Sequence, residues 1–265
     1  NAQERLEMEG LLRRALDQGE FRLHFQPQFR LDGSLSGCEA LVRWEQPRMG
    51  MIPPGKFIPI AEETGLILPL GNCVLREACR CMAGWIQQGY TGLTMAVNVS
   101  SMQFEQDDFV LRVEEALATE NLGPHQLELE LTESLVMENP RENARRLEAL
   151  RELGVRIAVD DFGTGYSSLS YLQRLPLDTL KIDQSFVRDI YPDTSHSISS
   201  APIVETIIGL ARNLHLSLMA EGVETEAQRE FLSNLKCDGM QGYLMGRPMD
   251  AAAFGLFLQS ATILK

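Results

Sequence analysis

Short apolar runs typical of β-strands alternate with longer amphipathic segments along most of the chain. The strand-like runs are Phe21–Phe29, Leu35–Trp44, Thr94–Ser100, Leu127–Thr132, Arg156–Phe162, Thr179–Asp183, Leu216–Gly222 and Gly239–Leu244. Helical spacing of apolar residues is found in Pro69–Gln88, Phe109–Thr119, Arg141–Leu153, Ser168–Leu172 and Ile203–Asn213. From the second run onward, this alternation predicts parallel βα units. Eight strands within residues 20–265 suit an α/β fold of the (β/α)8 barrel type.

The two ends of this pattern differ from a regular barrel. The first two strand-like runs are joined by a tight turn, Asp32-Gly33, which predicts an antiparallel hairpin. Residues 1–19 combine helical spacing with many charges, so we expect a helix that leads into the barrel or the tail of an interdomain linker. The chain begins with Asn1 rather than Met, which suggests that it comes from a longer protein.

Two loops are expected on other grounds. The polar, serine-rich segment Pro192–Ser200 is typical of a mobile surface loop. Met49 and Met51 flank a second loop, and we expect them to cover part of the core. Neither segment resembles the glycine- and proline-rich linkers that divide domains, so residues 20–265 are predicted to form one barrel.

Composition and charge narrow the function. The chain of 265 residues has 24 basic and 37 acidic residues, a formal net charge of −13, which would repel a nucleic-acid polymer. A small anionic substrate could still bind where divalent cations neutralise carboxylates. The five cysteines lack the spacing of a metal site, so we expect reduced thiols in a cytosolic protein. No apolar run approaches the length of about 18 residues that spans a bilayer.

Polar residues close the strand-like runs, directly after apolar stretches such as Met95-Ala96-Val97 and Ile157-Ala158-Val159. They are Glu39, Asn98, Glu130, Asp160, Asp161, Lys181, Asp183 and Glu221. Because the carboxyl ends of parallel barrel strands meet at one mouth, we expect these side chains to lie together there. Carboxylates gathered in this way repel each other, so either several stay protonated or cations occupy the site.

The donor types favour a hard divalent cation. Oxygen ligands with one amide, Asn98, are typical of Mg²⁺ or Mn²⁺ rather than zinc. Asp160 and Asp161 are neighbours at the end of a strand, where both can reach the mouth, and adjacent acids suit two ions about 3.5–4 Å apart. Lys181 and Asp183 should share one face. Lys181 could hold a water, pair with an acid or neutralise a phosphate oxygen, and a structural salt bridge is the alternative.

Seven motifs occur in order along the chain and together are specific. They are EALVRW (39–44), NVS (98–100), ELTE (130–133), DDFGTGYSS (160–168), LKID (180–183), EGVE (221–224) and QGY (241–243). With these motifs the chain resembles the EAL-domain cyclic-di-GMP phosphodiesterases from about Leu23 to Pro248. It departs from the pattern at Gln46, where a histidine is common, and at Met245-Gly246. The resemblance implies a modified TIM (β/α)8 barrel with an antiparallel first strand.

The resemblance also implies catalytic roles. The residues at its metal-coordinating positions are Glu39, Asn98, Glu130, Asp160, Asp161 and Glu221. Glu39 and Asp161 thereby belong to the catalytic machinery, in which Lys181 would hold the attacking water and Glu221 would act as a base. Two ions of Mg²⁺ or Mn²⁺ per site are implied. We expect Ca²⁺ to bind without supporting turnover, because its looser coordination geometry would place the water poorly.

Four residues are assigned to the substrate, cyclic-di-GMP. Arg43 resembles the arginine that grips a phosphate, a task that suits a guanidinium fork. Gln26 and Asp183 would also contact the substrate, and Gln241 matches a residue that helps to organise the site. The implied reaction is hydrolysis of one phosphodiester to linear 5′-pGpG. A catalytically silent cyclic-di-GMP receptor is the main alternative, and an enolase-type barrel enzyme is a further one.

The remaining implications concern regulation and surroundings. Glu133 resembles the residue that fixes the loop Phe162–Ser168, which couples the site to a homodimer interface formed by this loop and the helix after it. The charged first helix suggests an upstream cyclase-like or sensory domain in the parent protein. The substrate implies a cytoplasmic location, in a parent protein that could be tethered to the inner membrane.

Overall fold

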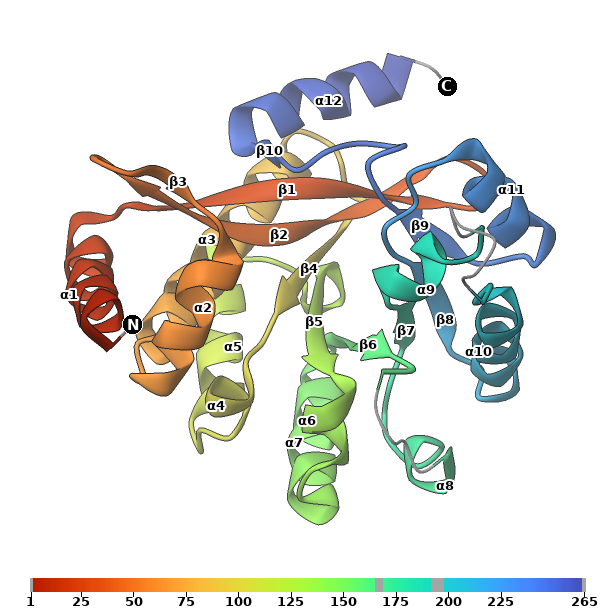
Figure 1. Ribbon diagram of the computed structural model, residues 1–265, viewed down its shortest axis with the longest axis horizontal. Coiled ribbons are helices and arrows are strands. Elements are labelled where there is room, and N and C mark those ends of the chain that lie inside the picture. Colours follow the sequence, from red (N-terminus) through yellow and green to blue (C-terminus); the bar gives the residue numbers. More distant parts are fainter. Residues whose placement is uncertain (1, 165–168, 192–197, 264–265) are drawn as a thin grey trace.

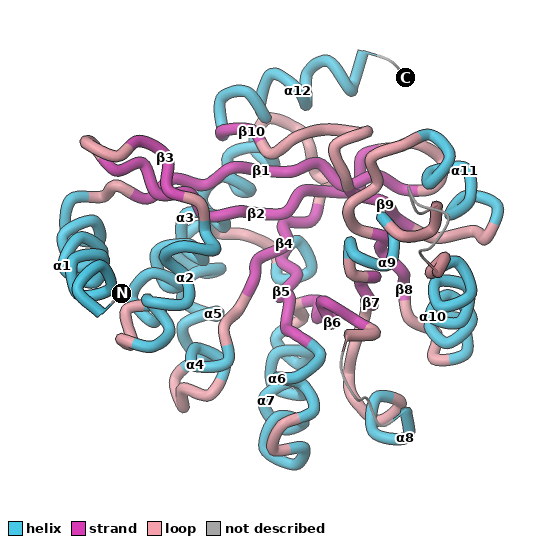
Figure 2. The backbone as a smooth tube through the Cα atoms, in the orientation of Figure 1, coloured by secondary structure: helices cyan, strands magenta, loops and turns pink. Residues whose placement is uncertain are grey.

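Eight strands close into a barrel in the computed structural model, which describes residues 2–164, 169–191 and 198–263 (Figures 1 and 2). In hydrogen-bonded order they are β1 (Phe21–Arg30), β9 (Gly239–Gln241), β8 (Ser217–Ala220), β7 (Thr179–Ile182), β6 (Arg156–Phe162), β5 (Leu127–Thr132), β4 (Thr94–Asn98) and β2 (Leu35–Gln46). Pairing of β1 with β2 closes the ring. Strand β1 is antiparallel to both of its barrel neighbours, whereas the other barrel pairs are parallel. The predicted modified barrel is confirmed.

Two short strands extend this sheet and were not predicted. Strand β3 (Gly50–Ile52) pairs with the end of β2, and β10 (Met249–Asp250) pairs with β1. The expectation that Met49 and Met51 cover the core is wrong. Their side chains are 58% and 50% exposed, because β3 projects from the barrel as the second half of a hairpin and has little to pack against.

Helices surround the barrel and connect its strands (Figure 1). They are α1 (Ala2–Gln18), α2 (Pro54–Glu63), α3 (Ile67–Gln87), α4 (Ser101–Phe104), α5 (Phe109–Glu120), the 3₁₀ turn η1 (Pro124–Gln126), α6 (Glu133–Met137), α7 (Pro140–Leu153), α8 (Leu169–Leu172), α9 (Gln184–Arg188), α10 (Ala201–Asn213), α11 (Glu226–Asn234) and α12 (Ala251–Ile263). The five predicted helical segments correspond to α3, α5, α7, α8 and α10. Most of the predicted loop 192–200 lies outside the described residues.

Capping residues in the sequence determine where two of these helices begin or end. Helix α7 begins at Pro140 and ends at Gly154, whose left-handed φ of 95° lets its N–H donate to the Arg151 carbonyl. Helix α11 begins with a capping box, in which the Thr225 hydroxyl accepts from the Gln228 N–H and the Gln228 amide accepts from the Thr225 N–H. The Gly154 cap ends α7 just before the chain enters β6, and the capping box starts α11 soon after β8.

The parallel strands have an apolar outer face and a polar inner face. In β5, Leu127, Leu129 and Leu131 are fully buried against the helices, and the alternate residues Glu128 and Glu130 are buried as well. Since neighbours along a strand point to opposite faces, the two glutamates turn into the barrel. The interior of this barrel therefore holds charged and amide side chains, which must find partners there.

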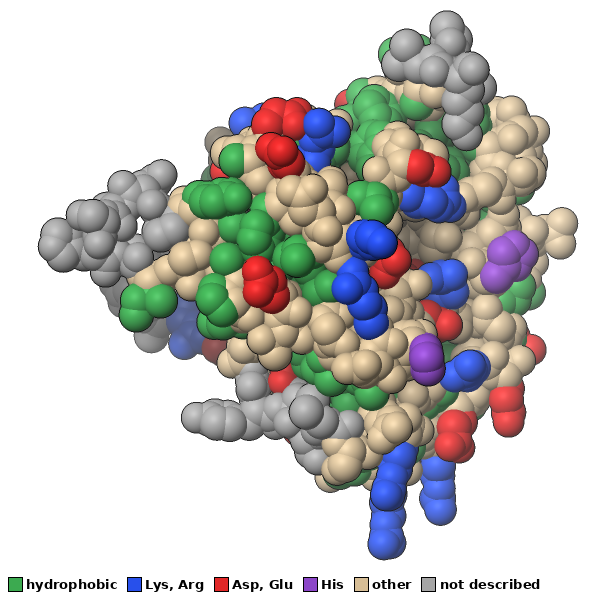
Figure 3. All heavy atoms as spheres, turned by 90° about the vertical axis from the view of Figure 1, so that its right-hand side faces the viewer, with side chains coloured by type: hydrophobic (Ala, Val, Ile, Leu, Met, Phe, Trp, Pro, Cys, Tyr) green, Lys and Arg blue, Asp and Glu red, His purple; other side chains and the backbone are tan. Residues whose placement is uncertain are grey.

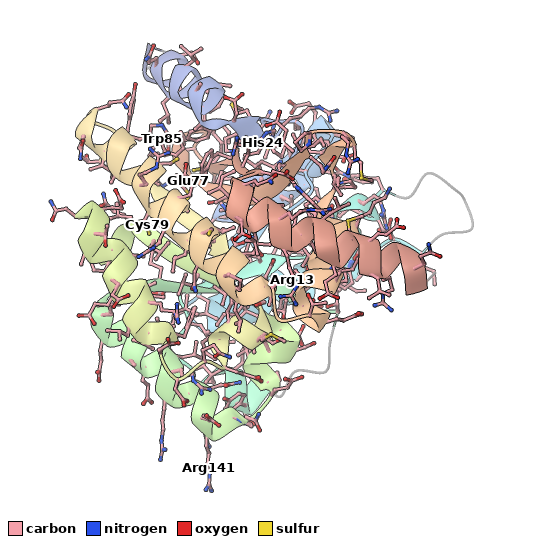
Figure 4. The ribbon with its side chains drawn as sticks, turned by 90° about the vertical axis from the view of Figure 1, so that its left-hand side faces the viewer. Arg13, His24, Glu77, Cys79, Trp85 and Arg141 are labelled. Atoms are coloured by element: carbon pink, nitrogen blue, oxygen red, sulfur yellow. The ribbon has the colours of Figure 1, made fainter. Side chains whose placement is uncertain are left out.

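A second hydrophobic cluster joins α1 to the rest of the molecule. Leu12 and Ala15 of α1 pack with Trp44 and Phe57, which belong to β2 and α2. Figure 4 shows α1, which carries Arg13, lying across the face of the molecule beside α3. The helix is therefore docked on the barrel, and its role as a linker to another domain stays a prediction.

Charged side chains of both signs are mixed on the face that Figure 3 shows. They form no continuous patch of either sign among its coloured residues. Within the described part of the chain, no helix is long and apolar enough to cross a membrane.

The backbones of β2 and β4 lie so close together at Gly37 that there is no room for a side chain. A Cβ atom at Gly37 would lie 2.0 Å from the Thr94 carbonyl oxygen, a backbone atom that cannot rotate away. We expect Gly37→Ala to lower the free energy of unfolding by about 1–3 kcal/mol. Gly92→Ala, where a Cβ would meet no atom within 4 Å, should change it by less than about 0.5 kcal/mol. Equal midpoints of urea denaturation for the two variants would contradict this account.

Candidate active site

The polar side chains predicted to share one mouth do lie together at one rim of the barrel. They are Glu39 (β2), Asn98 (β4), Glu130 (β5), Asp160 and Asp161 (β6), Lys181 (β7), Glu221 (after β8) and Gln241 (β9). All but Glu39 are at or near the carboxyl end of a strand or in the residue after it. The expectation that Glu39 closes a strand is wrong, because β2 continues to Gln46; Glu39 reaches the rim because it lies opposite Ala96, close to the end of the shorter strand β4. The barrel thus gathers residues that span more than two hundred positions of sequence.

A single ammonium group stands at the centre of this set. Lys181 is 1% exposed, and its Nζ lies 2.5 Å from Glu130 Oε1 and 2.5 Å from Glu221 Oε1. Glu39 Oε2 and Asp160 Oδ1 are 3.8 and 3.7 Å away. One positive charge therefore faces four carboxylates, and the site would carry an excess of negative charge if all four were ionised.

Two amides orient Glu39. The Asn98 side chain donates to Glu39 Oε1 at 2.6 Å, and Gln241 Nε2 donates to Glu39 Oε2 at 2.6 Å. Gln241 Nε2 also donates to Gln26 Oε1 at 3.0 Å, and Gln26 in turn donates to the Gly246 carbonyl. Both oxygens of Glu39 thus have an amide partner, which fixes the plane of its carboxylate.

The neighbouring acids of β6 both reach the rim because the strand is irregular there. Its register with β7 shifts between Val159 and Phe162, and Asp161 has a left-handed φ of 54°. Asp160 Oδ1 accepts the Asp161 N–H at 2.9 Å, and Asp161 also lies close to Asp183. A positive φ at a residue other than glycine is uncommon and marks a backbone held in place by its surroundings.

Crowding shifts the acid–base behaviour of the site. Burial, reinforced by the neighbouring carboxylates, raises the pKa of Glu130 well above its ordinary value. Burial likewise raises the pKa of Glu221 to about 8 despite the attraction of Lys181, and burial with Asp160 beside it raises the pKa of Asp161 to about 6. Burial would also raise the pKa of Glu39, but Lys181 and the two amides outweigh it and lower that pKa.

Lys181 keeps its proton in this environment. Burial alone would lower its pKa, yet Glu130 and Glu221 raise the pKa well above the usual value for lysine. Its ammonium group is therefore a permanent hydrogen-bond donor at neutral pH. Lys181 forms salt bridges with four acids, so the structural salt bridge and a role in catalysis both stay open as interpretations.

Two adjoining pockets open at this rim. One of about 260 Å³ is lined by Glu39, Asp160 and Glu221 among others, and one of about 380 Å³ is lined by Arg43 and Asn98. Leu41 lines both of them. A larger groove lies outside the barrel between α1 and α3, near His24 and Glu77 in Figure 4, and does not include the acidic cluster.

The residues expected to contact substrate or loop are placed as follows. Gln26 lines the smaller pocket and Arg43 the larger one. Asp183 caps α9 by accepting the Ser185 N–H at 3.0 Å, and it approaches Asp161. Glu133, 2% exposed, accepts the Gly163 N–H at 2.8 Å and so holds the start of the expected regulatory loop. Residues 165–168 of that loop lie outside the described residues.

Two features of the site were missed from the sequence. Gln28 donates to Gln241 Oε1 at 2.9 Å inside the barrel. The Arg247 guanidinium lies over the Tyr243 ring, 4.3 Å from its centroid, at the edge of the smaller pocket. Both contacts depend on which residues the fold brings together. The position of Gln28, two residues after Gln26 on the same strand, could however have indicated that its side chain also points into the barrel.

The composition of the site fits a hard divalent cation. Both oxygens of Glu130 are buried, and Lys181 Nζ lies 2.5 Å from its Oε1. Four carboxylates share one ammonium group, and oxygen donors with one amide suit Mg²⁺ or Mn²⁺. Among the described residues, however, no three His, Cys, Asp or Glu side chains form an assembled metal-binding group, because the carboxylates turn towards Lys181.

Comparison with known proteins connects this geometry to a family. The family model described as the EAL domain matches residues 10–248. The bifunctional diguanylate cyclase/cyclic di-GMP phosphodiesterase MucR of Pseudomonas aeruginosa is 48% identical over 252 residues, which are 95% of this chain and 36% of MucR. The cyclic di-GMP phosphodiesterase NbdA of the same organism is 44% identical over 260 residues, 98% of this chain and 33% of NbdA.

A solved structure is similar throughout the barrel. The PaMucR phosphodiesterase in its c-di-GMP complex has a TM-score of 0.90 and 46% sequence identity, covering 94% of this chain and 99% of that one. The chain spans about a third of the length of the curated relatives it matches.

The raised pKa values predict that cation binding releases protons. At pH 7, Glu221 with a pKa of about 8 is mostly protonated, and a carboxylate must lose its proton to coordinate a cation. Binding of Mg²⁺ or Mn²⁺ should therefore release at least about one proton per protein at pH 7, and fewer above pH 8. Titration calorimetry in two buffers of different ionisation enthalpy measures this number. Identical binding enthalpies in the two buffers would contradict it.

Proposed function

The chain belongs to the EAL domain family, and on that premise we propose that it hydrolyses cyclic di-GMP to linear 5′-pGpG. The cluster of four carboxylates around Lys181 carries the proposal. A catalytically silent receptor would need only a pocket for the nucleotide. It would have no use for a buried excess of acids that costs stability in the absence of a cation.

We assign cation binding to the acids of the rim. The proposed ligands are Glu39, Asn98, Glu130, Asp160, Asp161 and Glu221, holding two ions of Mg²⁺ or Mn²⁺. Their carboxylates would exchange contacts with Lys181 for contacts with the cations. When bound, divalent cations there supply Lewis acidity, which lowers the pKa of a water and offsets the charge of a phosphodiester. Ca²⁺ should bind without supporting turnover, because its coordination geometry is looser.

Lys181 and Glu221 would handle the attacking water. The Lys181 ammonium stays protonated, so it orients a water oxygen as a donor and stabilises negative charge that develops on the phosphate. Glu221 lies next to Lys181, and its carboxylate, once deprotonated on cation binding, could act as the base that removes a proton from this water. Attack at phosphorus then expels the ribose 3′-oxygen and opens the ring.

The two pockets would receive the substrate. Arg43 lines the larger pocket, where a guanidinium can bind a phosphate with two parallel hydrogen bonds. Gln26 lines the smaller pocket, Asp183 approaches the acids from α9, and Gln241 holds Glu39. Space on both sides of Leu41 suits a ligand larger than a mononucleotide. The similar fold of the PaMucR phosphodiesterase, solved as a c-di-GMP complex, supports a cyclic dinucleotide as the substrate.

The proposal also covers how the site is regulated, which domain precedes it and where in the cell it acts. We infer that Glu133, through its bond to the Gly163 N–H, couples the site to a homodimer interface formed by the following loop and helix. The longer relatives support an upstream cyclase-like or sensory domain. Because the proposed substrate is an intracellular nucleotide, we expect the domain to act in the cytoplasm.

The proposal is tested by incubation with cyclic di-GMP followed by chromatographic separation of nucleotides. Linear 5′-pGpG should form with Mg²⁺ or Mn²⁺, disappear in chelator, return when either ion is restored, and stay absent with Ca²⁺. Activity that survives in chelator would contradict the metal-dependent mechanism. Tight nucleotide binding without product at any ion concentration would instead support the receptor alternative.

Glu39→Ala separates function from folding. Removing this carboxylate should reduce turnover below about 1% of the unchanged protein and weaken Mn²⁺ binding, because Glu39 is a proposed ligand. The melting temperature in chelator should fall only slightly, because the loss of the Asn98 and Gln241 bonds to Glu39 is partly offset by reduced repulsion among the remaining carboxylates. Glu148→Ala on the exposed face of α7 is the matched control and should leave rate and melting temperature unchanged. A large loss of stability in Glu39→Ala alone would mean that its role is structural.

A further inference from the structure

The reversed strand β1 places a second glutamine directly against the site. Gln26 and Gln28 are two residues apart, so their side chains point to the same face of the strand, into the barrel. In the antiparallel registers, Gln26 stands opposite Glu39 of β2 and Gln28 stands opposite Gln241 of β9. Gln28 is only 4% exposed. Only a strand that runs against both neighbours gives this pair of alignments.

Both polar atoms of the Gln241 amide have partners in this arrangement. Its Nε2 donates both protons, one to Glu39 Oε2 and one to Gln26 Oε1, at 2.6 and 3.0 Å. Its Oε1 accepts from Gln28 Nε2 at 2.9 Å. Because an ionised carboxylate can only accept, Gln241 must present its NH₂ group to Glu39. Its oxygen is then directed elsewhere in the buried interior, where it needs a donor.

We propose that Gln28 is a positioning residue that sets the orientation of the Gln241 amide and, through it, the plane of the Glu39 carboxylate. Gln28 does not reach Glu39 or the pockets and acts through Gln241 alone. The inference rests on the proposed function in so far as Glu39 is taken to be catalytic. The orientation of the Gln241 amide can be determined independently of any activity, from a crystal structure at atomic resolution that distinguishes its oxygen from its nitrogen.

The physical reason is the cost of an unpaired oxygen. Without the Gln28 donor, the buried Oε1 of Gln241 loses its partner, which is far more costly than losing an exposed hydrogen bond. The amide can recover a partner by turning over, but its oxygen would then face the Glu39 carboxylate and repel it. Either outcome disturbs the position of Glu39, which must be held within a fraction of an ångström for catalysis.

A double-mutant cycle tests whether Gln28 acts through Gln241. Gln28→Met keeps the length of the side chain and removes the donor. It should lower kcat about tenfold and change KM by less than about threefold. Gln241→Met should lower kcat at least as much, and the double variant should be no worse than Gln241→Met within about twofold. Losses that multiply in the double variant would overturn the proposal.

Rescue and control variants separate positioning from packing. Gln28→Lys retains a donor of similar length and should restore kcat to within about threefold of the unchanged protein; a rate as low as that of Gln28→Met would overturn the donor role. Gln126→Met removes a buried amide at the opposite end of the barrel, where it donates to the Thr91 carbonyl and accepts from the Gly123 N–H. It should lower stability without changing kcat. If Gln28→Met does not fold, Gln28→Glu, which replaces the donor with an acceptor, takes its place in the cycle.

A crystal structure of Gln28→Met gives the readout that does not depend on turnover. The distance between Gln241 Nε2 and Glu39 Oε2, now 2.6 Å, should lengthen beyond hydrogen-bonding range or the amide should turn over. An unchanged Gln241 amide would overturn the inference whatever the rate. If the unchanged protein forms no linear product, the proposed function fails, but this structural comparison still decides the role of Gln28.

Discussion

One buried ammonium among four carboxylates is the interaction on which the site depends. Lys181 contacts Glu130 and Glu221 directly and lies within 4 Å of Glu39 and Asp160. A single charge cannot neutralise four, so the protein retains protons on some acids, and the raised pKa values of Glu130 and Glu221 express this. The same imbalance that penalises the site without cations is the physical basis for the proposal that it binds them.

The barrel makes this concentration of charge tolerable. Its strands turn apolar side chains outward to the helices, so the hydrophobic core lies between barrel and helices and the interior can be polar. Inside, the polar groups form two levels: Glu128 accepts from Thr179 at 2.8 Å, and Glu130 contacts Lys181 one step nearer the rim. Each pair joins β5 to β7 by residues two apart along their strands. Polar contacts thus replace apolar packing in the centre of the fold.

Much of this could be predicted from the sequence, because a buried parallel strand that ends in a carboxylate leaves both an apolar run and an acid in fixed order. The rim acids were found in that way. Helix α2 was missed because prolines at its start and at Pro59 weaken a helical pattern, and β10 has only two residues. The bond between Gln28 and Gln241 joins residues 213 positions apart, and only the register of β1 decides which side chains meet.

The reversed first strand therefore has a chemical consequence as well as a topological one. A parallel strand in the same place would present its side chains in the opposite order along the barrel axis. Gln28 would then stand nearer the rim than Gln26, and the pairing of Gln26 with Glu39 and of Gln28 with Gln241 would be lost. The inward-facing residues of β1 and β9 beside Glu39 are Gln26, Gln28 and Gln241, which are amides and carry no charge. Because an amide both donates and accepts, it can hold Glu39 in place without adding to the negative charge around Lys181.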